Sequence, residues 1–315
     1  MRERVERVFA SLERLIEALP VPTSHRELIW VHLSAGREKA LASPQLPAIQ
    51  LPFLVHSAVT GDERPALPIA EACTLLYFGA DLFDNIIDHE LPSSWDVRHP
   101  AEANLAATTL IAAVPQLAVG RLQDQGTPLA RLWTLAHLFA ETLLTMGAGE
   151  HEDLLFTGRD DVEPEMCRLM TERKSGSEFA LFAKAGAILA TGDQDVVEKY
   201  GAFGLCFGTA SQFRSDAQDI WAAETSTDLL NGRRTLPVVH ALSSLQGEGR
   251  ERLLGLLGDA RGSGERHDEV RALLAEAGSL RYTALVLEAY RHRARKDLAA
   301  ASPREPAGRD LRRLL

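Results

Sequence analysis

Residues 67–88 read LPIAEACTLLYFGADLFDNIID and join a long apolar helix to an acidic end. The segment carries one charge, Glu71, before it reaches Asp81, so we expect a helix that is covered on most of its sides. Its end places Asp84 and Asp88 four residues apart, on one helical face. Like charges at that spacing repel each other. The pair therefore predicts a cation at the end of this helix.

A second acidic pair closes another apolar run. Residues 200–213 are largely apolar and lead into RSDAQD at 214–219, which places Asp216 and Asp219 three residues apart. Carboxylates are hard ligands that suit Mg²⁺, and Mg²⁺ combines one or two of them with waters and phosphate oxygens. Two such pairs above an aliphatic cavity would hold a diphosphate through bridging ions, while an apolar chain lies in the cavity.

Apolar residues recur at helical spacing along almost the whole chain, and strand-like alternation is scarce. A further run at 179–190 is interrupted only by Lys184 and predicts another buried helix. We therefore predict one all-α domain over 1–315, with roughly ten or more helices around a central apolar cavity. An N-terminal helix within 1–22 and a loose tail with a short final helix at 299–315 complete it. Breakers rich in Pro and Gly separate the segments at 19–22, 91–94, 125–128 and 261–264.

Composition excludes some classes of function. The 315 residues include 44 acidic and 34 basic side chains, and the net charge of −10 argues against a nucleic-acid partner. Three widely spaced cysteines fit neither a disulfide framework nor a zinc site, and we interpret them as reduced core residues of a cytoplasmic protein. The charged start lacks the apolar core of a signal peptide, and no uncharged apolar stretch has the length of a membrane anchor.

Basic residues that could reach a phosphate stand near the second acidic pair. The sequence RKS at 173–175 offers Lys174, and DLLNGRRTLP at 228–237 offers Arg233 and Arg234. Guanidinium and ammonium groups are the usual partners of phosphate oxygens.

With these motifs in order, residues 36–315 resemble the trans-type isoprenyl diphosphate synthases of the polyprenyl synthetase family. Residues 84–88 stand where that family has its first DDxxD motif, and 215–219 where it has the second. Lys174-Ser175-Gly176 resembles its lysine-threonine-alanine signature, and Gln212 falls on its phenylalanine-glutamine pair. The segment 228–237 matches DLxxGKxTLP, with Arg233 for the lysine.

The resemblance implies the isoprenoid synthase fold, a homodimer, two or three Mg²⁺ ions, and ionisation of an allylic prenyl diphosphate. It also implies roles for single residues. The implied catalytic residues are Asp84, Asp88, Lys174 and Asp216. The implied metal ligands are Asp84, Asn85, Asp88, Asp216 and Asp219. The implied diphosphate-binding residues are Lys174, Ser175, Gln212, Arg233 and Arg234.

Helix geometry adds a prediction for the apolar part of the substrate. Ala80 and Leu76 lie one and two turns before Asp84, with Gly79 beside them, and we expect them to form the floor of the cavity. Because two of these side chains are small, we predict a substrate or product of about fifteen or more carbons.

Several positions depart from the family pattern. Asn85 and Ser215 each replace an aspartate. The sequence GREKAL at 36–41 stands in place of the GKRxRP motif, whose basic residues bind the homoallylic diphosphate in family members. After Asp88, only Arg98 and His99 stand where paired arginines are expected. Most of the cations for a second diphosphate are thus missing, and a buried diphosphate without partners is costly.

Three functions are compatible with this pattern. The first is a prenyltransferase that joins an allylic diphosphate to an acceptor. That acceptor is isopentenyl diphosphate if Arg37, Lys39, Arg98, Lys174 or other residues outside the motifs replace the missing cations, and a different molecule if none does. The second is a class I terpene cyclase that folds one prenyl cation on itself, shielded by aromatic side chains. The third is a non-catalytic subunit of a heteromeric synthase.

Overall fold

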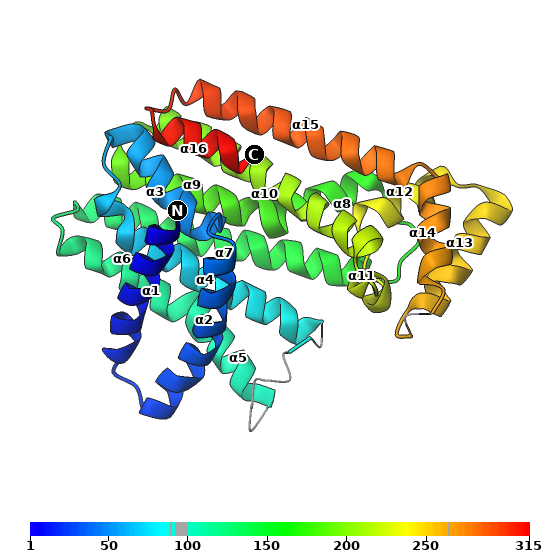
Figure 1. The fold of residues 1–315 in the computed structure, drawn as a ribbon, viewed down its shortest axis with the longest axis horizontal. Helices are drawn as coiled ribbons and strands as arrows, with labels where there is room; N and C mark the ends of the chain where they lie inside the picture. The colour runs from blue at the N-terminus through cyan, green and yellow to red at the C-terminus, as the bar shows by residue number, and fades with distance from the viewer. Residues whose placement is uncertain (89, 92–99, 264) are drawn as a thin grey trace. The chain divides into compact units, whose positions relative to one another are not determined.

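The computed structural model describes residues 1–88, 90–91, 100–263 and 265–315, and within them the chain is helical with no strand (Figure 1). The prediction of an all-α fold is confirmed. The described helices carry the labels α1 to α16 and agree with the prediction of roughly ten or more. The chain forms two compact units. Unit 1 comprises Met1–Ala140, Leu181–Gly201 and Leu298–Leu315, and unit 2 comprises Glu141–Ala180 and Ala202–Asp297. The single domain stays a prediction.

The first unit is built around α4 (Leu67–Ile87), the helix predicted to be central. Most of its apolar side chains are buried, and it packs against most other helices of this unit. Gly79 allows one of these close contacts, because a Cβ there would lie 2.8 Å from Ile111 Cγ1. The neighbours that α4 contacts are α1 (Arg2–Glu17), α2 (Thr23–Ala42), α3 (Pro47–Thr60), α5 (Pro100–Thr108), the π-helical turn η2 (Thr109–Ala113) and α6 (Val114–Gly120).

The C-terminal tail is held more firmly than the sequence suggests. The short final helix α16 (Ala307–Leu314) forms as predicted and packs against α3. The Arg304 amide donates to the Ala58 carbonyl at 2.8 Å, so the Pro-interrupted stretch before α16 is fixed to the same helix.

Four long helices contribute to both units, and the remaining short ones belong to unit 2. The shared helices are α7 (Leu129–Phe156), α9 (Ser177–Ala190), α10 (Gln194–Ala222) and α15 (Ser279–Ala300). The short helices of unit 2 are α8 (Pro164–Thr171), the π-helical turn η4 (Glu172–Gly176), α11 (Thr227–Asn231), α12 (Leu236–Ser244), α13 (Gly247–Ala260) and α14 (His267–Glu276).

A hydrophobic cluster in unit 2 fixes the C-terminal end of α10. Ile220 of α10 packs there with Leu229 of α11, Val238 of α12, Leu253 of α13 and Val270 of α14, and all five are fully buried or nearly so. Because Asp216 and Asp219 lie one turn or less before Ile220, this cluster determines the position of the second acidic pair.

Two described helical stretches are long and apolar enough to cross a membrane by length and composition, Arg64–Ile87 and Ala101–Gln123. In the first, 72% of the apolar window is buried inside the protein, as in a core helix of a soluble domain. All three cysteines are buried as well.

Candidate active site

The first acidic pair stands at the C-terminal end of α4. Asp84 occupies the last turn, and Asp88 caps the helix, with its amide bound to the Asp84 carbonyl at 2.9 Å. Both side chains and that of Asn85 are half-buried. The C-terminal end of a helix carries partial negative charge, so it disfavours carboxylates. The negative charges of Asp84, Asp88 and the helix end therefore add together, which favours the binding of a cation there.

The predicted floor of the prenyl-chain cavity stays a prediction. Leu76 has an exposed fraction of 0% and packs in the protein core, and Gly79 packs against η2. Ala80 is half-buried. A pocket on this part of α4 is lined by Tyr77 and Asp81, seven and three residues before Asp84.

In unit 2, three of the predicted residues form one hydrogen-bonded chain. The Ser175 hydroxyl donates to Gln212 Oε1 at 3.0 Å, and Gln212 Nε2 donates to Asp216 Oδ1 at 2.8 Å. Ser175 lies in the π-helical turn η4, and π-helical turns occur frequently at functional sites. The structure therefore joins the signature at 174–176 to the acidic end of α10.

Lys174 and Arg233 converge on acids that the sequence analysis did not assign to the site. Lys174 Nζ lies 2.6 Å from Glu150 Oε2 and 3.0 Å from Asp153 Oδ2. Arg233 Nη1 lies 3.2 Å from the same Asp153 oxygen. All four side chains are mostly buried. Asp153 thus holds the side chains of Lys174 and Arg233 close to each other. The only sequence signal for Asp153 was the GEHEDL segment at 149–154.

Gly149 makes this convergence sterically feasible. A Cβ at Gly149 would overlap the backbone nitrogen of Lys174, so only glycine lets α7 approach η4 this closely. We expect Gly149→Val to lower the free energy of unfolding by about 1–3 kcal/mol, because the inserted side chain forces the two helices apart. Urea unfolding measures this. Gly147→Val is the matched control, since its Cβ meets nothing within 4 Å on the same helix. Equal losses in the two variants would contradict the close approach.

Carboxylates crowd together in this unit. Burial raises the pKa of Asp216 to about 7, and the negative charges of Asp153 and Asp219 add to the effect, while Gln212 and Lys174 oppose it. Burial also raises the pKa of Asp228, and Asp216, Asp219 and Asp153 raise it further. A bound cation would reverse these shifts, because it favours the ionised forms. The sequence analysis did not single out Asp228 as a site residue.

Asp219 is engaged by the backbone around it. Its carboxylate accepts hydrogen bonds from the Thr227 amide and hydroxyl, both at 3.0 Å, from the Asp228 amide at 3.2 Å, and from the Ser226 hydroxyl. Asp219 therefore holds the N-terminal turn of α11, which carries Asp228. Any metal at Asp219 would share oxygens that already accept these bonds.

Arg234 does not reach the carboxylates. Its side chain is buried, and its guanidinium donates to the backbone carbonyls of Arg159 and Gly232. The prediction of Arg234 as a diphosphate ligand therefore stays a prediction, because its N–H groups bind these two carbonyls in the structure. Arg233 next to it points to Asp153.

The residues present fit a Mg²⁺ ion that is bound partly by phosphate oxygens, and not one that is bound by protein side chains alone. Within the described ranges, no three His, Cys, Asp or Glu side chains gather as a metal cluster. Mg²⁺ needs only one or two carboxylates when waters and phosphate oxygens complete its shell. Glu150 Oε1 and Thr235 Oγ1 are buried without a hydrogen-bond partner in the described structure, as expected where a polar ligand completes a site.

The described cations considered for a second diphosphate are Arg37 and Lys39 in unit 1 and Lys174 in unit 2. Arg37 is exposed, and Lys39 Nζ lies 3.8 Å from Asp81 Oδ2. Lys174 pairs with Glu150 and Asp153 as described above. Arg98 and His99 lie outside the described residues.

Comparison with known proteins gives consistent matches. The polyprenyl synthetase family model matches residues 64–276. The (2E,6E)-farnesyl diphosphate synthase of Mycobacterium tuberculosis is 28% identical over 237 residues, which cover 72% of this chain and 64% of that protein. The chain thus spans somewhat less than two thirds of that relative. A talaropentaene synthase of Talaromyces verruculosus is 26% identical over 195 residues, 56% of this chain and 28% of that protein.

Among solved structures, a polyprenyl synthetase from Streptomyces coelicolor A3(2) aligns with a TM-score of 0.82. The alignment covers 100% of this chain and 97% of that one at 22% sequence identity. This likeness confirms the predicted isoprenoid synthase fold.

Proposed function

The chain belongs to the polyprenyl synthetase family, and we propose on that basis that it uses Mg²⁺ to ionise an allylic prenyl diphosphate and transfers the prenyl group to an acceptor. The observation that carries this proposal is the polar centre of unit 2. Asp216 is buried with a raised pKa and interacts electrostatically with Asp153 and Lys174, and Lys174 and Arg233 both pair with Asp153. Such a centre suits a diphosphate that arrives with metal ions, because the ions neutralise the carboxylates and the cations bind the phosphates.

Each residue has a distinct task in this proposal. Asp84 and Asp88 from α4, and Asp216 from α10, would hold Mg²⁺, which when bound supplies positive charge to the leaving diphosphate. Lys174 and Arg233 would bind diphosphate oxygens directly. Asp153 positions both cations before substrate arrives, so that binding costs little side-chain conformational entropy.

The site for a second diphosphate is degenerate in this proposal. Two family arginines are replaced by Glu38 and Ala40, and the nearby Lys39 pairs with Asp81. A second diphosphate would therefore meet a carboxylate at the position where it needs cations. The preferred acceptor is accordingly a molecule other than isopentenyl diphosphate.

Product analysis tests the proposal. The protein is incubated with Mg²⁺ and geranyl, farnesyl or geranylgeranyl diphosphate, each with and without isopentenyl diphosphate. We expect diphosphate release that does not depend on isopentenyl diphosphate. Chain elongation that requires isopentenyl diphosphate would contradict the degenerate second site. No turnover in any mixture would contradict the proposed activity and favour a non-catalytic subunit.

A group of aromatic side chains favours a second candidate, a class I terpene cyclase acting on one prenyl diphosphate. Three aromatic side chains of unit 2 form a contiguous group that could face such a cation. The Phe179 and Phe207 rings are 5.4 Å apart, and the Phe203 and Phe207 rings 6.0 Å. A cyclic hydrocarbon or alcohol formed from a single substrate would favour this candidate.

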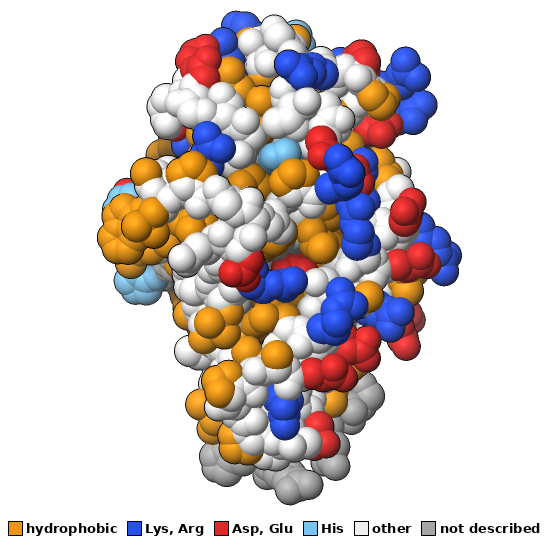
Figure 2. Space-filling view, turned by 90° about the vertical axis from the view of Figure 1, so that its left-hand side faces the viewer, with side chains coloured by type: hydrophobic (Ala, Val, Ile, Leu, Met, Phe, Trp, Pro, Cys, Tyr) orange, Lys and Arg blue, Asp and Glu red, His pale blue; other side chains and the backbone are white. Residues whose placement is uncertain are grey.

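We also propose that the protein is a homodimer that packs through α7. Leu129 and Trp133, one turn apart on this helix, are 77% and 76% exposed. Large apolar groups that are exposed side by side mark interaction surfaces. Figure 2 shows one face of the molecule, where hydrophobic side chains lie among charged ones.

A negative charge introduced beside Leu129 on α7 should dissociate the dimer. We expect Trp133→Glu to shift the mass in solution from twice 34.5 kDa to 34.5 kDa, as measured by light scattering after gel filtration. The reason is that a carboxylate opposes burial of the apolar face. Leu285→Glu is the matched control, since Leu285 is 72% exposed on a different helix, α15. Dissociation by Leu285→Glu alone would place the interface elsewhere.

A further inference from the structure

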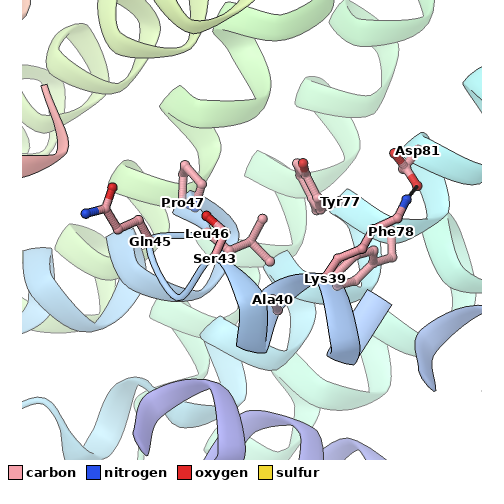
Figure 3. A pocket seen from close by; sticks show the side chains of 9 residues that line it. All are labelled: Lys39, Ala40, Ser43, Gln45, Leu46, Pro47, Tyr77, Phe78 and Asp81. Carbon is pink, nitrogen blue, oxygen red and sulfur yellow. Dashed lines mark ion pairs between the residues drawn. The ribbon is translucent and has the colours of Figure 1, made fainter. Parts of the chain in front are cut away.

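A pocket of about 330 Å³ opens beside α4, close to the first acidic pair (Figure 3). Its volume lies near the lower end of the range for small-molecule sites, about 300–1,000 Å³. The polar residues that line it are Lys39, Ser43, Gln45, Tyr77 and Asp81. They come from the end of α2, from the connection to α3, and from α4.

The pocket carries no net charge among its described lining residues. Lys39 and Asp81 are the only ionised side chains there, and they pair at 3.8 Å, as the dashed line in Figure 3 shows. A diphosphate needs several cations or hydrogen-bond donors to leave water. Here it would meet one lysine that is already next to a carboxylate. The pocket therefore disfavours an anion.

The remaining lining suits an uncharged molecule. Tyr77 and Ser43 offer hydroxyl groups and Gln45 an amide, and each can donate or accept a hydrogen bond. Phe78 and Leu46 add apolar surface. A pocket of apolar walls with a few polar groups is typical of sites that orient a small neutral ligand.

The position of the pocket links it to the reaction. Tyr77 and Asp81 precede Asp84 by seven and three residues, so they share its helical face. With a rise of about 1.5 Å per residue, they lie roughly 10 and 5 Å before Asp84 along the helix. A ligand in this pocket would thus lie beside a prenyl diphosphate anchored at the Asp84–Asp88 end of α4.

We propose that this pocket binds the acceptor of the prenyl group, and that the acceptor is an uncharged compound with a hydroxyl group. The inference rests on the proposed function and names the class of its second substrate. In the transfer, the bond between C1 and the diphosphate oxygen breaks and its electron pair leaves with diphosphate. A lone pair of the hydroxyl oxygen forms the new bond to C1, and the hydroxyl proton passes to the Asp81 carboxylate and then to water.

Binding can be measured without turnover. The probe is 4-methylphenol, a neutral hydroxyl compound, observed by saturation-transfer NMR on the native protein. Ser43→Trp should block the pocket, and the exposure of Ser43 makes this change compatible with folding. Ala42→Trp is the matched control, because Ala42 is also exposed and does not line the pocket. Thermal melting confirms that both variants are folded.

The expected result is a transfer signal in the native protein and in Ala42→Trp that is lost in Ser43→Trp. Isopentenyl diphosphate should not displace the probe from the native protein. Asp81→Arg should raise the affinity of the protein for isopentenyl diphosphate by roughly tenfold or more, because the paired carboxylate becomes a second cation.

Two results would overturn the inference. One is a signal that Ser43→Trp leaves unchanged. The other is isopentenyl diphosphate binding to the native protein as tightly as to Asp81→Arg. Diphosphate release from farnesyl diphosphate is measured in parallel. Release without probe binding overturns only the acceptor pocket, whereas probe binding without release from any prenyl diphosphate overturns the proposed function and with it the acceptor role.

Discussion

Replacement of Asp84 by alanine is expected to reduce Mg²⁺-dependent release of diphosphate by roughly a hundred- to a thousandfold, the effect of losing one major electrostatic contact to the transition state. Asp84 and Asp88 share a face at the C-terminal end of α4, where the helix itself offers no positive charge. A metal ion there would depend on both carboxylates. Release is measured as inorganic diphosphate formed from farnesyl or geranylgeranyl diphosphate.

Asp195→Ala serves as the control for Asp84→Ala. Asp195 lies in the first turn of α10, its side chain is 72% exposed, and it pairs with Lys199 one turn away. Exposed pairs of this kind contribute about 0.3–0.5 kcal/mol, so activity should not change. Near-native release by Asp84→Ala, or a comparable loss in both variants, would contradict the assignment of the first acidic pair.

Replacement of Asp216 by asparagine is expected to abolish activity and, in the absence of metal, to stabilise the protein. Asp216 is buried, and its pKa is raised to about 7 from an ordinary value of 3.8. The fold therefore disfavours the ionised form. Asparagine has the same shape, can still accept the hydrogen bond from Gln212, and carries no charge. The gain in unfolding free energy should be roughly 1–4 kcal/mol at pH 8.

The pH dependence of this gain has a definite sign. Because the folded pKa is higher than the unfolded one, the cost of Asp216 is fully present above about pH 7. It declines as the pH falls through 7 toward 3.8, and the native protein and Asp216→Asn should become equally stable near pH 4. Urea unfolding at several pH values in the presence of EDTA measures the difference.

Mg²⁺ supplies an independent check of the same residue. Together with a diphosphate it should raise the melting temperature of the native protein, because both bind the folded state. The rise should be much smaller in Asp216→Asn. A variant that is less stable than the native protein at pH 8, or that keeps its activity, would contradict the proposed role of Asp216.

Much of the fold was predictable from apolar periodicity. The segment 67–88 forms α4 with the predicted start and end, since a long uncharged run leaves no alternative to a buried helix. The acidic pairs were also visible, because i,i+3 and i,i+4 spacings determine a helical face without any tertiary information. Periodicity does not reveal which face of a buried helix remains open, so the pocket that Tyr77 and Asp81 line was not predicted.

The polar network of unit 2 was harder to predict. Asp153 lies 21 residues before Lys174 and 80 before Arg233 in the sequence, and the three meet only through helix packing. Gly149 controls that packing, yet a glycine inside a helix has no distinctive sequence signal. For Arg233 and Arg234, adjacent in the sequence, only the structure shows that one faces the acidic centre while the other binds backbone carbonyls.

The central claim is that this protein ionises a prenyl diphosphate with the help of metal ions held by its two acidic pairs. The most direct test is the release of inorganic diphosphate from geranylgeranyl diphosphate alone, with Mg²⁺ or with EDTA, and without any second substrate. We expect release with Mg²⁺ and none with EDTA. Release that is equal under both conditions, or absent under both for geranyl, farnesyl and geranylgeranyl diphosphate, would contradict the claim.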